Sequence, residues 1–211
     1  MEYPGYGVYD GQPSEQRMCR DAVRVFDYLT KNLLISNKSI SVLGRSMGSG
    51  PAIHLSSVRD PAHCILVSPY TSIRRVTSDL LGNFLSSLLL IKERFENLRV
   101  IPGVDCPLLL IHGQKDKLVK VANSHELAEA AVSSAGVELV VNEEMGHNEF
   151  NLYIEIVNPI YEFFKKEGFS ERASGCIKTQ CLLSFHRIIE KFLEVLERRS
   201  TSEQGTKSSV E

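Results

Sequence analysis

The hydrophobic pattern alternates short, continuous apolar runs with longer stretches of helical spacing. Four runs are typical of buried strands, at residues 39–45, 63–69, 107–112 and 137–141. Continuous apolar runs of this length are expected of parallel strands that are covered on both faces. Because helical stretches separate them, the sequence predicts an α/β fold with a mostly parallel sheet flanked by helices.

The first predicted helix covers residues 15–32, with Ser14 as its N-cap. Its expected buried face recurs every three or four residues and comprises Met18, Ala22, Val25, Phe26 and Leu29. A second helix is expected to begin near Met47, and others at residues 79–91, 121–134 and 153–166. The last of these is expected to bury Ile154, Val157, Ile160, Tyr161 and Phe164.

Composition narrows the class of protein. The 211 residues are 43% hydrophobic and 24% charged, with a formal net charge of -2. These values are typical of a globular domain and give no reason to expect nucleic acid as a partner. The five cysteines are odd in number and scattered, which indicates reduced thiols in a cytoplasmic protein. They have no metal-ligand spacing, so we expect neither a metal nor a cofactor.

The candidate chemistry begins at Gly44-Arg45-Ser46-Met47-Gly48, between a predicted strand and a predicted helix. A serine on such a turn is exposed in strained backbone geometry, and Gly44 and Gly48 give the room that the turn needs. The backbone N–H of Met47 would then face a developing oxyanion. A purely structural glycine turn explains this stretch alone about equally well.

Two further polar residues follow the ends of strands. Asp116 comes just after the run 107–112, and His147 lies on the loop after 137–141. Taken alone, Asp116 is more typical of a turn or helix N-cap, whereas His112, inside its strand, is interpreted as a hydrogen-bonded core histidine. The chain order Ser46, Asp116, His147 is that of the α/β-hydrolases. In such a triad the imidazole takes the serine proton and the carboxylate orients the imidazole, so the order favours a catalytic interpretation.

From about Tyr3 to Phe164 the chain resembles the α/β-hydrolases, in particular the α/β-hydrolase domain-containing protein 17 group. The resemblance rests on Glu-Tyr-Pro-Gly-Tyr-Gly, Gly-Arg-Ser-Met-Gly-Ser-Gly-Pro, Ser-Pro-Tyr-Thr-Ser, Ile-His-Gly-Gln-Lys-Asp and Gly-His-Asn-Glu. It implies a serine hydrolase peripheral to membranes that removes palmitate from protein cysteines. It also implies that Ser46 is the nucleophile, Asp116 the acid, His147 the base and the Met47 N–H an oxyanion donor. The implied partner is an acylated protein or a small acyl ester.

The start of the chain departs from the family pattern. Residues 1–7 are interpreted as the end of a strand and a glycine turn. In the family the strand beside the serine strand comes earlier, and its loop supplies a second oxyanion donor. We therefore expect an N-terminally shortened chain that lacks the N-terminal strands and has its serine strand at the sheet edge.

The predicted organisation is a partial α/β-hydrolase domain at 1–167, a linker and amphipathic helix at 168–199, and a disordered tail at 200–211. The helix, from about Ile177 to Arg199, is expected to pack on the domain, with docking to a partner or membrane as the alternative. The expected function is ester or thioester hydrolysis, most specifically depalmitoylation. The alternatives are a carboxylesterase or serine peptidase of the same fold, and an inactive shortened form that acts as a binding module.

Overall fold

The computed structural model describes residues 3–81 and 94–168. Contacts divide the chain into residues 1–163 and 164–211, and every described strand belongs to the first part. The domain boundary predicted at residue 167 therefore stays a prediction. The helix predicted at 177–199 and the tail predicted at 200–211 lie outside the described residues.

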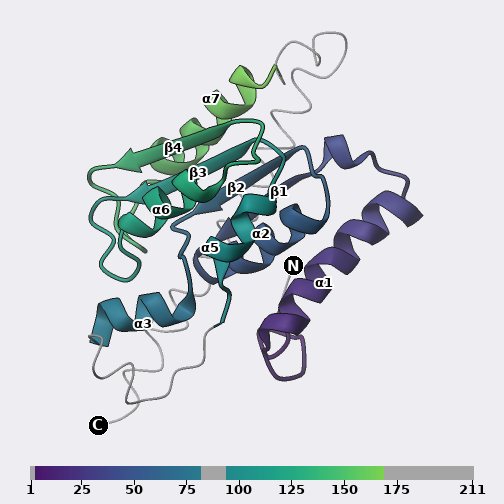
Figure 1. Cartoon of the computed structure of the whole chain (residues 1–211), viewed down its shortest axis with the longest axis horizontal. Coiled ribbons are helices and arrows are strands. Elements are labelled where there is room, and N and C mark those ends of the chain that lie inside the picture. The colour runs from purple at the N-terminus through teal and green to yellow at the C-terminus, as the bar shows by residue number, and fades with distance from the viewer. Residues whose placement is uncertain (1–2, 82–93, 169–211) are drawn as a thin grey trace. The chain divides into compact units, whose positions relative to one another are not determined.

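A parallel four-stranded sheet organises residues 3–163 (Figure 1). Each strand pairs in parallel with the next, in the order β1 (Ser41–Arg45), β2 (His63–Val67), β3 (Leu108–Gly113) and β4 (Val137–Asn142). All four predicted strands are present, with ends that differ by one or two residues. Since the strands run in the same direction, their carboxyl ends meet at one edge of the sheet, where functional groups of α/β proteins gather.

The two central strands are the most deeply buried part of the fold. Every residue of β2 and β3 is buried, as expected for parallel strands covered on both faces. The main apolar cluster joins them to the helices and comprises Ala52, Ile53, Cys64, Leu66, Ile101, Val104, Cys106, Leu108, Leu110, Leu127 and Ala131. This core holds the strand ends in fixed positions beneath the loops that follow them.

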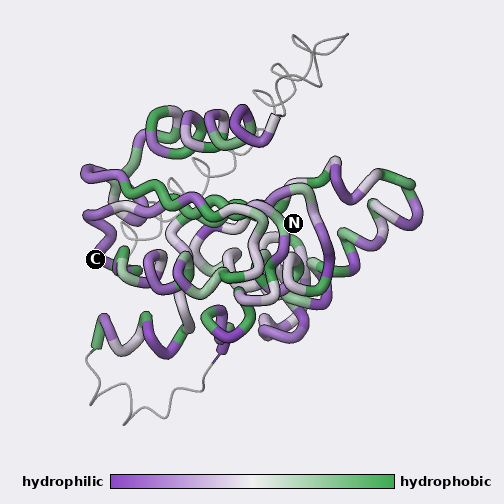
Figure 2. The backbone as a smooth tube through the Cα atoms, turned by 45° about the horizontal axis from the view of Figure 1, so that its top comes forward, coloured by the Kyte–Doolittle hydropathy of each residue, from purple (hydrophilic) through white to green (hydrophobic). Residues whose placement is uncertain are grey.

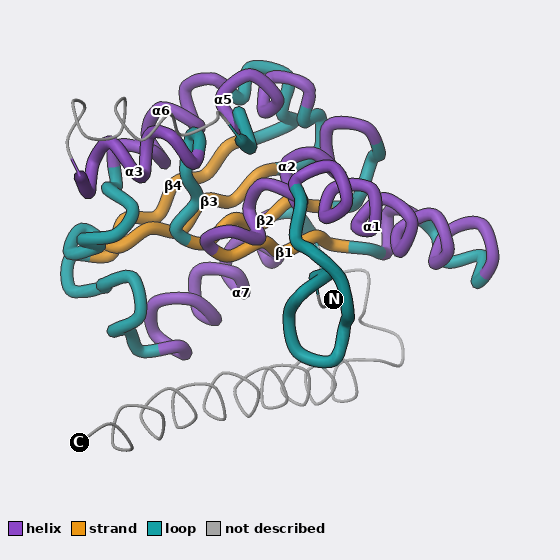
Figure 3. Tube along the Cα trace, turned by 90° about the horizontal axis from the view of Figure 1, so that it is seen from below, coloured by secondary structure: helices purple, strands orange, loops and turns teal. Residues whose placement is uncertain are grey.

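Helices cover both faces of the sheet. Figure 3 shows α2 (Ser49–Val58), α5 (Asn97–Val100) and α6 (Ala122–Ala130) on one face, and the start of α7 (Asn158–Lys166) on the other. Phe163 of α7 meets His63 of β2 edge to face, with ring centroids 5.6 Å apart. Hydrophilic and hydrophobic residues alternate along the helices (Figure 2), as expected of elements with one buried side.

The first helix largely agrees with its prediction. α1 (Glu15–Asp27) packs against α2 and continues as a π-helical turn, Tyr28–Asn32. The Ser14 hydroxyl accepts a hydrogen bond from the Arg17 N–H at 3.3 Å, so Ser14 is the N-cap. The buried face was wrong at Val25, which is 46% exposed. Val25 lies at the margin of the stripe formed by Met18, Cys19, Ala22 and Phe26.

The buried face predicted for the last helix was right at Ile160 and wrong at Ile154 and Tyr161, while Val157 and Phe164 are partly buried. Ile154 is 64% exposed and Tyr161 47% exposed, whereas Ile156, Ile160 and Phe163 are buried. The apolar residues of this segment are compatible with two different buried helix faces, and both faces include Ile160. A π-helical turn at Tyr153–Val157 precedes α7, and its wider turn changes which residues face the sheet.

Two other helix predictions had wrong bounds. The helix predicted at 121–134 ends at Ala130, because Ala131 leaves the helical region and the Ser134 side chain instead bonds to the Cys106 carbonyl at 2.9 Å. The helix predicted at 79–91 begins earlier, as α3 (Ile73–Leu81), and its remaining residues lie outside the described range.

The glycine turn predicted near the start of the chain is present, whereas Tyr3, predicted at the end of a strand, lies in none. Gly5 and Gly7 have φ values of 83° and 54°, and the Gly5 N–H bonds to the Tyr9 carbonyl at 2.7 Å. Positive φ at two glycines in three residues bends the backbone too sharply for a strand. In the sheet, β1 pairs with β2 alone among the described strands, so the expected edge position of the serine strand is confirmed.

Leu34 provides a stability prediction. It has a φ of 55° and is 83% exposed, just after the turn in which the Ile35 N–H bonds to the Leu29 carbonyl at 3.0 Å. Glycine is the usual residue where the chain leaves a helix in the left-handed backbone conformation. Any other side chain in that conformation costs about 1 kcal/mol. We expect Leu34→Gly to raise the free energy of unfolding by about that amount in urea denaturation. Leu33→Gly, at a φ of -90°, should lower it instead.

Candidate active site

Ser46 stands on a strained turn between β1 and α2. Its φ is 49°, and a 3₁₀ turn, Ser46–Gly48, leads directly into α2. A side chain at Gly44 would place its Cβ 2.5 Å from the Gly48 carbonyl oxygen and 2.7 Å from the Ala52 Cβ. Strand and helix approach so closely only because residue 44 is glycine. The strained elbow expected from the sequence is therefore present.

The backbone after Ser46 is fixed from two sides. The Ser49 hydroxyl donates to the Ser46 carbonyl at 2.7 Å, and the Tyr70 hydroxyl donates to the Met47 carbonyl at 3.3 Å. These bonds hold the peptide that carries the Met47 N–H, the expected oxyanion donor. The N–H groups of a first helical turn have no partner within the helix, which suits them to bind a negative charge.

Asp116 lies just beyond β3 and is 5% exposed. Its Oδ1 accepts hydrogen bonds from the backbone N–H groups of Leu118 at 3.0 Å and Val119 at 2.8 Å. Its Oδ2 is 2.7 Å from Nδ1 of His147. The backbone bonds fix the plane of the carboxylate and turn Oδ2 toward the imidazole.

His147 connects the other two predicted residues. Its Nε2 is 3.0 Å from the Ser46 Oγ. Because an ionised carboxylate only accepts hydrogen bonds, Nδ1 carries the proton and donates to Asp116. Nε2 is then free to accept the hydrogen bond that the Ser46 hydroxyl donates. The structure thus brings Ser46, Asp116 and His147 into one hydrogen-bonded chain, although they lie far apart in the sequence.

The surroundings of Asp116 keep it ionised. Burial on its own raises the pKa of the carboxyl group, but hydrogen bonds from His112, His147 and the Val119 N–H outweigh burial and hold the pKa below its ordinary value. A charged acid can therefore stabilise a protonated His147 at neutral pH.

His112 is the hydrogen-bonded core histidine expected from the sequence. It is fully buried, with Nδ1 2.6 Å from the Ser124 Oγ and Nε2 2.8 Å from the Val119 carbonyl oxygen. Since a carbonyl only accepts, Nε2 carries the proton, and the same edge of the ring lies 3.5 Å from Asp116 Oδ2. His112 thus supports the acid, a role that its position inside a strand did not reveal.

Sequence reasoning also missed the need for glycine at the end of β3. A Cβ on Gly113 would lie 2.0 Å from the Met145 carbonyl oxygen, in the loop that precedes His147. The Lys115 N–H donates to the same carbonyl at 3.1 Å. The loop that carries Asp116 and the loop that carries His147 are therefore in backbone-to-backbone contact. A glycine directly after an apolar strand was the available signal.

The chain is similar to known proteins both in sequence and in structure. No family model matches the chain. The α/β-hydrolase domain-containing protein 17C of Homo sapiens is 30% identical over 167 residues, which are 79% of this chain and 48% of that protein. The α/β-hydrolase domain-containing protein aho-3 of Caenorhabditis elegans is 28% identical over 83% of this chain and 51% of that protein. The chain thus spans about half the length of these relatives.

The solved structures agree with the sequence relatives. An esterase of Pyrococcus furiosus superposes with a TM-score of 0.60 at 23% identity, covering 78% of this chain and 68% of the esterase. A puromycin-hydrolyzing peptidase of Mycobacterium tuberculosis superposes with a TM-score of 0.56 at 17% identity, covering 70% and 24%. This chain has the α/β-hydrolase fold. The resemblance to the protein 17 group, inferred from short motifs, is confirmed by the relatives named above.

A hollow of about 470 Å³ adjoins His147. Half of its lining residues are charged, namely Lys115, Lys117, Glu144 and Glu149, and the others are Leu118, Gly146, His147 and Asn148. Lys115 and Glu144 form an ion pair across it.

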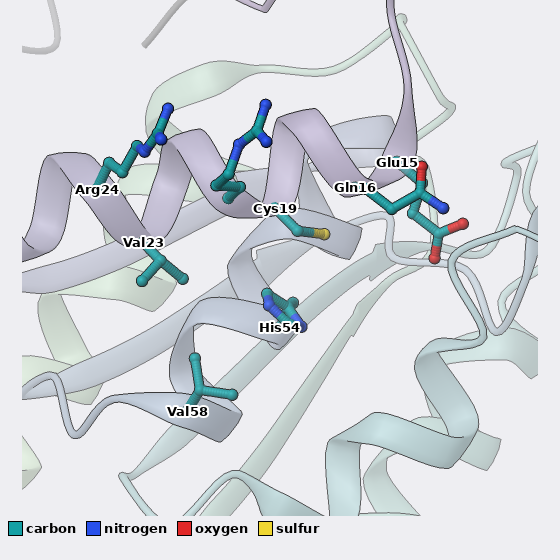
Figure 4. A pocket seen from close by; sticks show the side chains of 8 residues that line it. Glu15, Gln16, Cys19, Val23, Arg24, His54 and Val58 are labelled. Atoms are coloured by element: carbon teal, nitrogen blue, oxygen red, sulfur yellow. The ribbon is translucent and has the colours of Figure 1, made fainter.

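A second hollow, of about 540 Å³, lies between α1 and α2 and contains no triad residue (Figure 4). Cys19 faces it, with His54 opposite. Burial, assisted by the charge of Glu15, raises the pKa of the Cys19 thiol to about 11. The thiol is therefore protonated at neutral pH and is a poor nucleophile.

The described ranges hold neither a candidate metal site nor a membrane-spanning helix. Residues 3–81 and 94–168 contain no group of three or more His, Cys, Asp or Glu side chains that could hold a metal ion. In those ranges, no helix combines the length and the hydropathy needed to cross a bilayer. Cys19, Cys64 and Cys106 are free thiols.

The pKa of Asp116 predicts a pH dependence of stability. A carboxyl group whose pKa is lower in the folded than in the unfolded chain stabilises the fold above its unfolded pKa of about 3.9. This contribution is lost as the pH falls from there toward the folded pKa. We expect the stability difference between the wild type and Asp116→Asn, measured by urea denaturation, to be constant from pH 7 to about pH 5 and to shrink below about pH 4. An unchanged difference at about pH 3 would contradict the ionised state assigned to Asp116.

Proposed function

We propose that this chain is a serine hydrolase that cleaves esters or thioesters through an acyl-Ser46 intermediate. One observation carries the proposal, namely the continuous chain of hydrogen bonds from Ser46 Oγ through His147 to Asp116, at 3.0 and 2.7 Å. Serine is a weak nucleophile until a base takes its proton, and this arrangement supplies the base and the group that orients it.

In the first half-reaction the Ser46 Oγ attacks the substrate carbonyl carbon while His147 Nε2 takes the hydroxyl proton. The Met47 N–H donates to the oxyanion of the tetrahedral intermediate. Collapse breaks the bond to the leaving group, and protonated His147 gives its proton to the departing alcohol or thiol. In the second half-reaction His147 deprotonates a water molecule, which attacks the acyl-serine, and the acid product leaves as Ser46 regains its proton.

We further propose that the preferred substrate is a protein with an acylated cysteine, in the cytoplasm or at a membrane surface. The resemblance of the sequence motifs to the protein 17 group implies this substrate class, and the names of the relatives describe them only as α/β-hydrolases. The hollow beside His147, with two lysines and two glutamates in its lining, also gives a polypeptide charged groups to contact. Free thiols at Cys19, Cys64 and Cys106 favour a reducing compartment.

Two alternatives have some support. A carboxylesterase or a serine peptidase of the same fold fits the same three residues, and the similar solved structures are those of an esterase and a peptidase. A binding module without activity is the rival from another class. It would need an ordered fold without a reactive Ser46.

Labelling with a fluorophosphonate probe tests the proposal. The wild type should form a covalent adduct at Ser46, and Ser46→Ala and His147→Ala should form none while retaining the wild-type circular dichroism. Ser57→Ala is the matched control, because Ser57 lies near the other end of α2, where its hydroxyl donates to the His54 carbonyl at 2.8 Å, and its loss should leave Ser46 reactive. A folded wild type that takes no label would favour the binding module. Rates on a series of acyl thioesters and esters would then separate the substrate classes.

A further inference from the structure

Arg45 connects the serine strand to the histidine loop. It is the last residue of β1, its backbone pairs with Val67 of β2, and the next residue in the chain is Ser46. Its Nη2 donates to the His147 carbonyl at 2.5 Å and to the Asn148 Oδ1 at 2.9 Å. One side chain therefore joins the strand that ends at the nucleophile to the backbone of the base.

The histidine loop is otherwise held mainly near its ends. At its start the Met145 carbonyl accepts from the Lys115 N–H, and the Gly146 N–H, just before His147, bonds to the Glu149 carbonyl, just after Asn148, at 2.8 Å within the loop itself. The hydrogen bonds from Arg45 act at the centre of the loop, on the carbonyl group of His147 and the side chain of Asn148. They restrain the backbone from which the imidazole projects toward Ser46.

The Arg45 guanidinium is a charged group in a partly buried position. It lies over the Phe150 ring, 5.3 Å from the centroid, and its Nε is buried without a hydrogen-bond partner among the described residues. Burial lowers the pKa of the guanidinium, and the charge of Asp116 opposes that shift. Arginine nevertheless remains charged in proteins. Holding this cation beside the loop therefore costs desolvation free energy.

We propose that Arg45 is a positioning residue that sets the distance between His147 Nε2 and Ser46 Oγ. The inference rests on the proposed function for its effect on catalysis, while the placement of the loop can be measured separately. Arginine suits the task because its planar group can stack on Phe150 and direct N–H donors at two oxygens at once. A lysine at this position would keep the charge but lose the planar contact.

Kinetics on an acyl ester that the wild type hydrolyses provide the first test. We expect Arg45→Ala to lower kcat about 10²-fold with little change in KM, because misplacement by about 1 Å costs that much in rate. Arg45→Lys should lower kcat about tenfold, and guanidinium ion at low concentration should restore part of the activity of Arg45→Ala. Asn148→Ala, which removes one of the two acceptors from the exposed side, should cause a smaller loss in the same parameter.

Arg75→Ala is the matched control, because Arg75 pairs with Asp79 and Glu126 away from the triad. It should leave kcat unchanged. A wild-type kcat in Arg45→Ala, or an equal loss in Arg75→Ala, would overturn the proposal. Should Arg45→Ala fail to fold, the comparison of Arg45→Lys and Asn148→Ala with the wild type decides in the same way.

A measurement without substrate separates this inference from the proposed function. The proton between His147 Nδ1 and Asp116 should give a far-downfield proton resonance, which Asp116→Asn removes. We expect Arg45→Ala to broaden this resonance and to speed hydrogen exchange of the loop amides, with Arg75→Ala as control. If the wild type takes no fluorophosphonate but Arg45→Ala still loosens the loop, the proposed function fails and the positioning role stands. An unchanged resonance and unchanged exchange would overturn the positioning role.

Discussion

Asp116→Asn will lower kcat about 10⁴-fold toward any ester or thioester that the wild type hydrolyses. The geometry explains the size of the effect. The N–H groups of Leu118 and Val119 will draw the amide oxygen to the position of Oδ1, which leaves the amide NH₂ facing His147. Nδ1 must then accept, so the proton moves to Nε2, and Nε2 can no longer take the proton of Ser46.

Steady-state kinetics and the rate of fluorophosphonate labelling both measure this effect, with circular dichroism to verify the fold. Glu144→Gln is the matched control, because Glu144 lines the hollow beside His147 and pairs with Lys115 without contacting the imidazole. It should change the rate by little. If Asp116→Asn kept its rate within tenfold of the wild type, Asp116 would have no role in orienting the base.

The sequence was sufficient to predict the sheet and the three central residues. Buried parallel strands are read directly from continuous apolar runs, and Ser46, Asp116 and His147 each follow such a run. Because the carboxyl ends of parallel strands meet at one edge, their proximity follows from topology alone. The hydrogen-bond distances add what topology leaves open, which is the direction in which each side chain points.

What the sequence could not give depends on contacts between distant residues. Nothing local indicates that Arg45 reaches the carbonyl of His147, or that His112 lies behind Asp116. The buried face of the last helix was wrong at Ile154 and Tyr161, where a π-helical turn at Tyr153–Val157 departs from the period of 3.6 residues. Periodicity therefore locates an element reliably, whereas its buried face depends on turns that periodicity assumes to be regular.

The two glycines of the elbow motif will respond very differently to alanine. Sequence reasoning assigned the same role to both, but the structure separates them. A Cβ at residue 44 meets backbone atoms of Gly48 at 2.5 and 2.9 Å, and these cannot move without opening the elbow. We expect Gly44→Ala to lower the free energy of unfolding by about 3 kcal/mol or more. At residue 48 the nearest atom is the Tyr3 hydroxyl oxygen at 3.3 Å, and φ is -67°.

Gly48→Ala should therefore stay within about 1 kcal/mol of the wild type in urea denaturation, since helical backbone suits alanine and the end of a tyrosine can shift. Both variants keep the same serine and the same histidine, so fluorophosphonate labelling of the folded fraction reports on the elbow itself. Gly48→Ala should be labelled at nearly the wild-type rate. Any folded Gly44→Ala should be labelled far more slowly, because a displaced α2 moves both the Ser46 Oγ and the Met47 N–H. Equal stability of the two variants would mean that strand and helix are not in close contact at Gly44.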